Sequence, residues 1–211
     1  HITARGFNDG AAHRGALPPT YNQYSLMTAA NGFDRAHDSH RMVYYPLFIT
    51  GFVLDDYLFD HDFFSADKII LSSASSKTSF SLAFLLNRNR DRHVTGLTSR
   101  GNKSFVENIG IYDEVVTYDT VETMTASSKI AYIDMAGNHE VLRKVHHHFG
   151  DNVTCSCGVG ITHWDSRDSA EPSSLPGAKP TMFFAPTQIQ KRHQEWGPEK
   201  LQAEMQNAWA E

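Results

Sequence analysis

The chain has 211 residues, of which 40% are hydrophobic and 20% are charged, and its formal net charge at pH 7 is −5. This composition is typical of a globular protein that buries one sizeable core. The mild acidity argues against a general binder of nucleic acids or of membrane surfaces. Cys155 and Cys157 stand one residue apart in a strand-like run, and we expect reduced thiols and hence a cytoplasmic protein.

Residues 1 to 45 are polar and aromatic and have no clear hydrophobic period. We predict an irregular lead-in here, with at most one short strand or turn, followed by a domain over residues 46 to 211. A helix is predicted to begin at Pro46, because apolar residues from Leu47 to Leu58 recur on one broad face. The cluster of Tyr21, Asn22, Gln23 and Tyr24 could line a pocket or simply pack a loop onto the core.

The stretch from Lys68 to Leu86, KIILSSASSKTSFSLAFLL, predicts a buried strand, a loop of small residues and an apolar helix. A strand that leads through such a loop into a helix N-terminus is a phosphate site, because the free N–H groups and the helix dipole favour an anion. The loop has no glycine, so it matches neither the dinucleotide fingerprint nor a complete P-loop. An ordinary strand-to-helix connection with a serine N-cap is the alternative.

The same pattern repeats further along the chain. Strands are predicted at 94–98, 115–118, 130–134 and 153–161, with helices at about 103–108, 139–149 and 198–209. This alternation predicts an α/β fold, a Rossmann-like doubly wound parallel sheet with helices on both faces. Ligands of such sheets bind beyond the carboxyl ends of the strands.

The end of the second predicted strand of this sheet carries Thr98, Ser99, Arg100 and Lys103, and no acid before Glu107. An acid at this place holds the ribose 2′-hydroxyl of NAD, whereas a cation accommodates the 2′-phosphate of NADP. The two hydroxyls and two cations therefore favour NADP over NAD. A solvated basic turn is the alternative.

Five segments together resemble one family: SSASSKTSFSLAFLL, GLTSRGNKSFVENIGIYDEVVTYD, YIDMAGN, VGITHW and FFAPTQIQKR. The chain looks like a member of the DUF2855 family, which is related to medium-chain dehydrogenase/reductases of the quinone-oxidoreductase type. The resemblance implies a Rossmann domain that binds NADP(H), and a reductase-like activity without zinc. It also implies that most of the N-terminal GroES-like domain is lacking here, and that a homodimer could pair through a sheet edge.

Carried over by position, the resemblance assigns the pyrophosphate to the loop after the first strand and the adenosine phosphate to the turn after the second. The turn after 130–134 and the segment 160–164 would approach the ribose and the nicotinamide. The cofactor-binding candidates are Ser72, Ser73, Ser75, Ser76, Lys77, Thr78, Thr98, Ser99, Arg100, Lys103, Asp134, Met135, Ala136, Gly137, Asn138, Gly160 and Thr162.

We expect an NADPH-dependent reductase of a carbonyl or an activated C=C substrate, with the protein orienting the reactants and supplying a proton. The candidate proton donors are Tyr21, Tyr24 and His163, because phenol and imidazole both serve as general acids. One alternative is a non-catalytic NADP(H)-binding sensor or scaffold. Another is a P-loop-like phosphotransferase, which would need Asp134 to hold Mg²⁺. The expected partner is a small-molecule substrate, and no nucleic acid, membrane or metal ion is expected.

Overall fold

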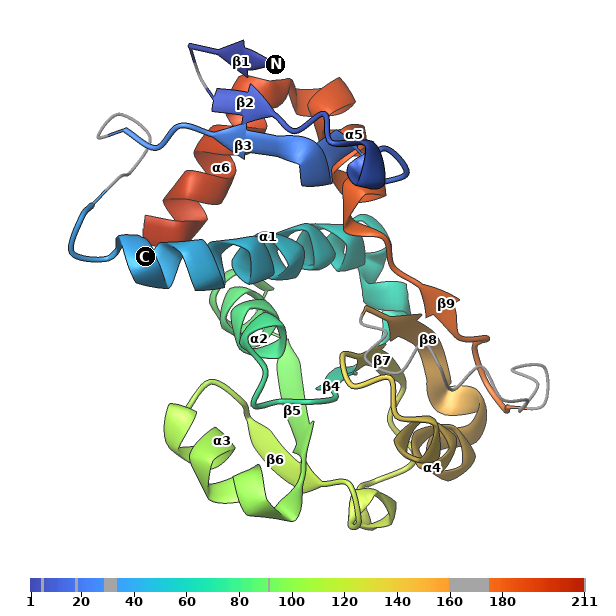
Figure 1. The fold of residues 1–211 in the computed structure, drawn as a ribbon. Helices are drawn as coiled ribbons and strands as arrows, with labels where there is room; N and C mark the ends of the chain where they lie inside the picture. The colour runs from blue at the N-terminus through green and yellow to red at the C-terminus, as the bar shows by residue number, and fades with distance from the viewer. Residues whose placement is uncertain (5, 18, 29–33, 91, 160–174, 211) are drawn as a thin grey trace. The chain divides into compact units, whose positions relative to one another are not determined.

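The computed structural model of the chain describes all residues except 5, 18, 29–33, 91, 160–174 and 211 (Figure 1). The chain folds into two compact units. The first unit consists of residues 1–45 and 186–211, and the second consists of residues 46–185.

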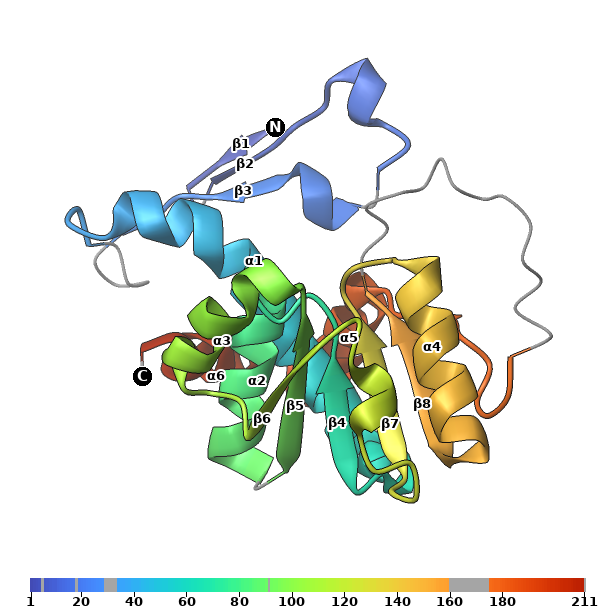
Figure 2. The same cartoon turned by 90° about the horizontal axis from the view of Figure 1, so that it is seen from below.

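The second unit is built on a parallel sheet of six strands, most of which run side by side in Figure 2. In chain order the strands are β4 (Lys68–Leu71), β5 (His93–Thr98), β6 (Glu114–Thr117), β7 (Ile130–Asp134), β8 (Val153–Gly158) and β9 (Thr181–Met182). In space the order is β6-β5-β4-β7-β8-β9, and every neighbouring pair is parallel. This is the strand order of the doubly wound dinucleotide-binding fold, so the predicted fold class is confirmed.

Alternate residues of each strand point to opposite faces of the sheet and meet different helices. On one face Ile69 and Leu71 of β4 lie in a core cluster with Leu82 and Leu86 of helix α2 (Lys77–Arg90). On the other face Ile70 of β4 lies in a cluster with Tyr132 of β7 and with three apolar residues of helix α4 (His139–Phe149). These three are Val141, Val145 and Phe149. Helix α3 (Lys103–Ile109) follows β5 and buries Val106.

Helix α1 (Asp38–Asp60) has Pro46 in its interior, so the prediction that a helix begins at Pro46 is wrong. Proline fits the first turn of a helix because it has no N–H, and this is why the residue indicated a start. Within a helix its ring opposes the carbonyl four residues earlier, that of Met42, which is an exposed residue. Among the described residues, no helix has the length and apolarity to cross a membrane.

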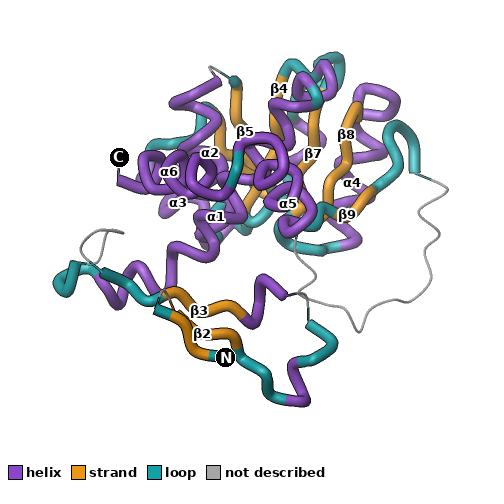
Figure 3. The backbone as a smooth tube through the Cα atoms, turned by 90° about the horizontal axis from the view of Figure 1, so that it is seen from above, coloured by secondary structure: helices purple, strands orange, loops and turns teal. Residues whose placement is uncertain are grey.

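The first unit contains a three-stranded antiparallel sheet in the order β1-β2-β3, whose strands β2 and β3 lie side by side in Figure 3. The strands are β1 (Ile2–Thr3), β2 (Gly6–Asn8) and β3 (Gln23–Ser25). The sequence predicted an irregular lead-in with at most one strand, because strands of two or three residues are too short to show a period. The unit also includes helix α6 (Pro198–Ala210) and all but the first residue of helix α5 (Ala185–Trp196).

Candidate functional site

Four loops of the second unit follow parallel strands and therefore lie at the same edge of the sheet. They begin after Leu71 of β4, Thr98 of β5, Thr117 of β6 and Asp134 of β7. Strands β4 and β7 are neighbours, yet the helices that follow them, α2 and α4, pack on opposite faces. This is the topological switch point at which doubly wound sheets bind ligands.

A buried hydrogen-bond bridge joins the two strand ends at this switch point. The Ser72 hydroxyl donates to Oδ1 of Asp134 at 2.6 Å, and both side chains are buried. The same hydroxyl oxygen accepts from the backbone N–H of Met135 at 2.8 Å and of Ala136 at 3.0 Å. Asp134 Oδ1 also accepts from the N–H groups of Ala136 and Gly137, at 3.0 and 3.1 Å. Ser72 and Asp134 therefore hold the turn after β7 against the end of β4.

The loop after β4 uses serine where a glycine would be expected. Ser73 has a φ of +52°, a left-handed conformation that costs an L-residue roughly 1–2 kcal/mol. Ser76 caps helix α2, since its hydroxyl oxygen accepts from the N–H of Ser79 at 3.2 Å. Lys77 and Thr78 form the first turn of α2, with Lys77 exposed and Thr78 partly exposed.

Two tyrosines, which the sequence analysis did not select, brace this loop. The Tyr118 hydroxyl accepts from the N–H of Ser73 at 2.9 Å, and the Tyr112 hydroxyl donates to the carbonyl of Ala74 at 2.9 Å. Burial raises the pKa of both phenols. The signal for Tyr118 was its position at the end of the third predicted strand of the sheet, at the same edge as the loop.

The four candidates at the end of β5 do not form one group. Thr98 is only 1% exposed, whereas Ser99 is exposed. Arg100 forms an ion pair with Asp119, which follows β6. Lys103 forms an ion pair with Glu107 one turn further along α3. Hydrogen bonds from Thr117 and Arg100 hold the pKa of the Asp119 carboxyl below its usual value.

The turn after β7 leads directly into helix α4. Gly137 has a φ of +64°, and the Asn138 side chain caps α4 by accepting from the N–H groups of Glu140 and Val141, at 2.9 and 3.3 Å. Next to the turn, on β7, the hydroxyl of Tyr132 is buried and has no hydrogen-bond partner within the described part of the chain. Met135 is also buried, and Ala136 is partly exposed.

The remaining candidates belong to other parts of the chain. Gly160, Thr162 and His163 lie outside the described residues. Tyr21 and Tyr24 belong to the first unit, whereas the other described candidates belong to the second. Tyr24 stacks on Phe7 with ring centroids 4.6 Å apart.

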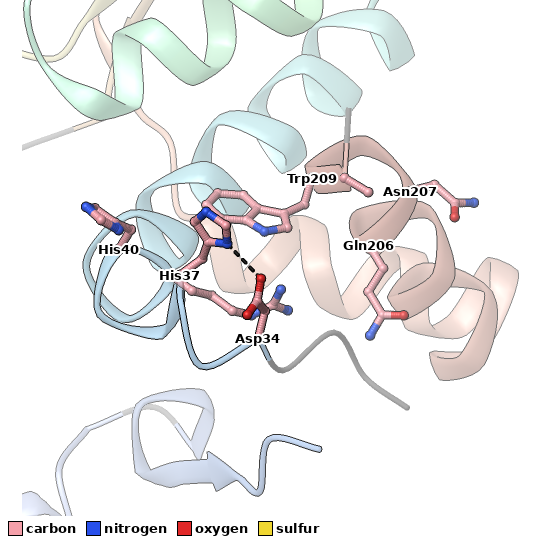
Figure 4. A pocket seen from close by; sticks show the side chains of 8 residues that line it. Asp34, His37, His40, Gln206, Asn207 and Trp209 are labelled. Carbon is pink, nitrogen blue, oxygen red and sulfur yellow. Dashed lines mark hydrogen bonds and ion pairs between the residues drawn. The ribbon is translucent and has the colours of Figure 1, made fainter. Parts of the chain in front are cut away.

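The first unit contains a hollow of about 660 Å³, which the sequence analysis did not predict (Figure 4). The His37 ring Nδ1 lies 2.7 Å from Oδ2 of Asp34, and this hydrogen bond lowers the pKa of that carboxyl. The lining residues are Asp34, His37, His40, Arg41, Gln206, Asn207, Trp209 and Ala210. The guanidinium of Arg41 lies 4.3 Å from the ring centroid of Tyr45 and 5.8 Å from that of Trp209.

Comparison with known proteins gave one family and several solved structures. The family model described as "Protein of unknown function (DUF2855)" matches residues 1–211. The comparison with curated proteins found no match. Among solved structures, the chain is similar to the YhdH oxidoreductase of Salmonella enterica in complex with NADP, at 15% identity and a TM-score of 0.49. That match covers 74% of this chain and 52% of the other.

Two further solved structures are similar over smaller shares. YhdH of E. coli K-12 with bound NADPH matches at 18% identity and a TM-score of 0.36, covering 53% of this chain and 35% of the other. A cobalt- and zinc-bound thermostable alcohol dehydrogenase from Pyrobaculum aerophilum matches at 14% identity and a TM-score of 0.38, covering 67% and 37%. The chain thus spans about half or less of the length of these solved proteins.

Proposed function

The chain belongs to the DUF2855 family, and we propose that its second unit binds NADP(H) at the carboxyl edge of the sheet. We further propose that the protein is a reductase of a carbonyl or an activated C=C substrate. The observation that carries the proposal is the strand order β6-β5-β4-β7-β8-β9, with α2 and α4 on opposite faces. Such an arrangement puts the loop after β4 and the N-terminus of α2 at the switch point where dinucleotides bind.

The pyrophosphate would lie against the first turn of α2. The first N–H groups of a helix have no backbone acceptor within the helix, and the helix dipole adds partial positive charge. Lys77 adds a cation, and Ser75 and Thr78 add hydroxyl groups. The hydroxyls of Ser72 and Ser76 bond within the protein, so we assign them to holding the loop and the start of α2 in place rather than to contacting the cofactor.

Tight support of the loop favours this assignment. Tyr118, Tyr112 and the Ser72–Asp134 bridge fix its backbone at three points, so little conformational entropy would be lost on binding. Arg100 and Lys103, with Ser99, would contact the adenosine phosphate. Residues 135–138 would approach the ribose and the nicotinamide, together with Gly160 and Thr162.

NADPH, when bound, would supply the hydride, and the protein would orient the substrate and provide the proton. Tyr21, Tyr24 and His163 remain our candidates for the proton donor. The cytoplasmic location and the homodimer also remain predictions. Strands β6 and β9 form the two edges of the sheet at which a second copy could pair.

A non-catalytic NADP(H)-binding module is the second candidate function. It is favoured by the observation that no candidate proton donor is a described residue of the sheet unit. We do not propose a phosphotransferase. The Oδ1 of Asp134, whose carboxylate would have to hold Mg²⁺, already accepts hydrogen bonds from Ser72, Ala136 and Gly137.

The test is a titration of the purified chain with NADPH and, separately, with NADH. Binding is monitored by the fluorescence emission of the three tryptophans. The double variant Arg100→Ala, Lys103→Ala should weaken NADPH binding. The control is the double variant Arg143→Ala, Lys144→Ala, which likewise removes one arginine and one lysine, but from α4. It should leave NADPH binding unchanged.

Binding of NADPH together with turnover on a panel of carbonyls and enones would support the reductase, whereas binding without turnover would favour the non-catalytic module. If neither nucleotide binds, the dinucleotide proposal fails for this chain.

A further inference from the structure

Two strand ends bring opposite charges together at the expected adenosine end of the site. Arg100 follows β5, and Asp119 follows β6, and their side chains form an ion pair. The register of these two parallel strands pairs Thr98 with Thr117, so the residues that follow them leave the sheet side by side. The side chain of Arg100 is 83% exposed and that of Asp119 is 45% exposed, so a ligand at this edge can reach both.

Asp119 supplies an acid that the sequence did not place at the end of β5. The general rule assigns the ribose 2′-hydroxyl to an acid at the end of the second strand and the 2′-phosphate to a cation nearby. Here the cation comes from the second strand of the sheet and the acid from the third. The turn therefore offers one group suited to each form of the cofactor, and the two groups bind each other.

We propose that Asp119 competes with the 2′-phosphate for Arg100 and thereby reduces the preference of the site for NADP(H) over NAD(H). This inference rests on the proposed function. A 2′-phosphate carries a charge of about −1.5 to −2 at pH 7. Arg100 has to share its charge between that phosphate and the Asp119 carboxylate, and the two anions repel each other. NAD(H) has a hydroxyl at this position, which donates to Asp119 and leaves the ion pair intact.

The competition has a bounded size because the pair is exposed to water. Exposed ion pairs and like-charge repulsion across water are both weak interactions. We expect Asp119→Asn to tighten NADPH binding about threefold to tenfold. NADH binding should stay the same or weaken, because the amide is a poorer acceptor than the carboxylate.

The experiment compares the wild-type chain with Asp119→Asn and with Asp151→Asn. Asp151 is an exposed aspartate in the turn Gly150–Asn152 before β8. It lies at the amino ends of the strands, so its variant makes the same chemical change away from the site at the carboxyl ends. The probes are NADPH, NADH, 2′,5′-ADP and 5′-AMP. The two fragments report on the adenosine end alone. Thermal unfolding of each variant verifies that it is folded.

The expected result is tighter binding of NADPH and of 2′,5′-ADP by Asp119→Asn, with no gain for 5′-AMP and no change in Asp151→Asn. The gain should become smaller when Arg100→Ala is added, because no cation is then released and only the relief of repulsion between the two anions remains. If wild type binds NADPH and Asp119→Asn binds it equally or more weakly, the inference is overturned and the proposed function stands. If wild type binds none of the four probes, the proposed function fails and takes the inference with it.

Discussion

The bridge between Ser72 and Asp134 makes a sharp prediction about stability. Ser72→Ala removes the hydroxyl that donates to the Asp134 carboxylate and accepts from the N–H of Met135. The site is buried, so the groups left behind have little access to water. Ala136 keeps its second acceptor, Oδ1 of Asp134 at 3.0 Å. The loss therefore falls on the carboxylate and on one amide.

The size of the effect follows from these two groups. A hydrogen bond to a charged acceptor contributes about 1.5–3 kcal/mol, and a buried amide without a partner costs about 1–3 kcal/mol. Partial relaxation of the turn reduces the sum, and we expect Ser72→Ala to lower the free energy of unfolding by about 2–4 kcal/mol. In a domain of this size, that corresponds to a fall in Tm of roughly 5–15 °C.

The assay is urea denaturation followed by circular dichroism, with Ser75→Ala as the matched control. The Ser75 hydroxyl accepts a bond from Asn102 at 3.2 Å near the surface, so its loss should cost less than about 0.5 kcal/mol. Adding Asp134→Asn to each serine variant measures the coupling energy between that serine and Asp134. The coupling should exceed about 1 kcal/mol for Ser72 and should be smaller for Ser75. If Ser72→Ala and Ser75→Ala prove equally stable, the bridge does not hold the turn and our reasoning is wrong.

Three further predictions concern the backbone and the core. The backbone of Ser73 is in the left-handed conformation, which glycine adopts without strain and valine does not. The free energy of unfolding of Ser73→Gly should therefore exceed that of Ser73→Val by about 1–2 kcal/mol in the same assay, and the reverse order would contradict the positive φ. Burial lowers the pKa of His146; the unfolded chain therefore takes up a proton first, and stability should fall below about pH 6.5 by at most about 1.4 kcal/mol per pH unit. Between pH 8 and pH 5 the free energy of unfolding should fall less steeply in His146→Gln than in wild type. The exposed control His139→Gln should keep the wild-type slope. In Gly51→Ala the new Cβ would lie 2.8 Å from Cβ of Ser81, so the free energy of unfolding should fall by about 1–3 kcal/mol. An unchanged midpoint of the urea transition would refute this close approach.

Local sequence was enough to predict most elements of the sheet unit. Ile130–Asp134 and His139–Phe149 have the predicted bounds, because a buried apolar run and an Asn N-cap are properties of neighbouring residues. The small residues 72–78 likewise indicated a loop before a helix without any knowledge of the fold, although α2 already begins at Lys77. The fold class followed from the alternation of such elements, since parallel strands joined by helices have few allowed arrangements.

The contacts that shape the candidate site were decided only by the tertiary structure. Ser72 and Asp134 are 62 residues apart and Ser73 and Tyr118 are 45 apart, and Asp119 reaches Arg100 from a different strand. Each contact depends on which strands are neighbours and on their register, and a change of one residue in register would turn these side chains to the other face. Hydrophobic pattern and turn chemistry act over a few residues, so they determine the elements, whereas packing of the whole sheet determines which side chains meet at its edge.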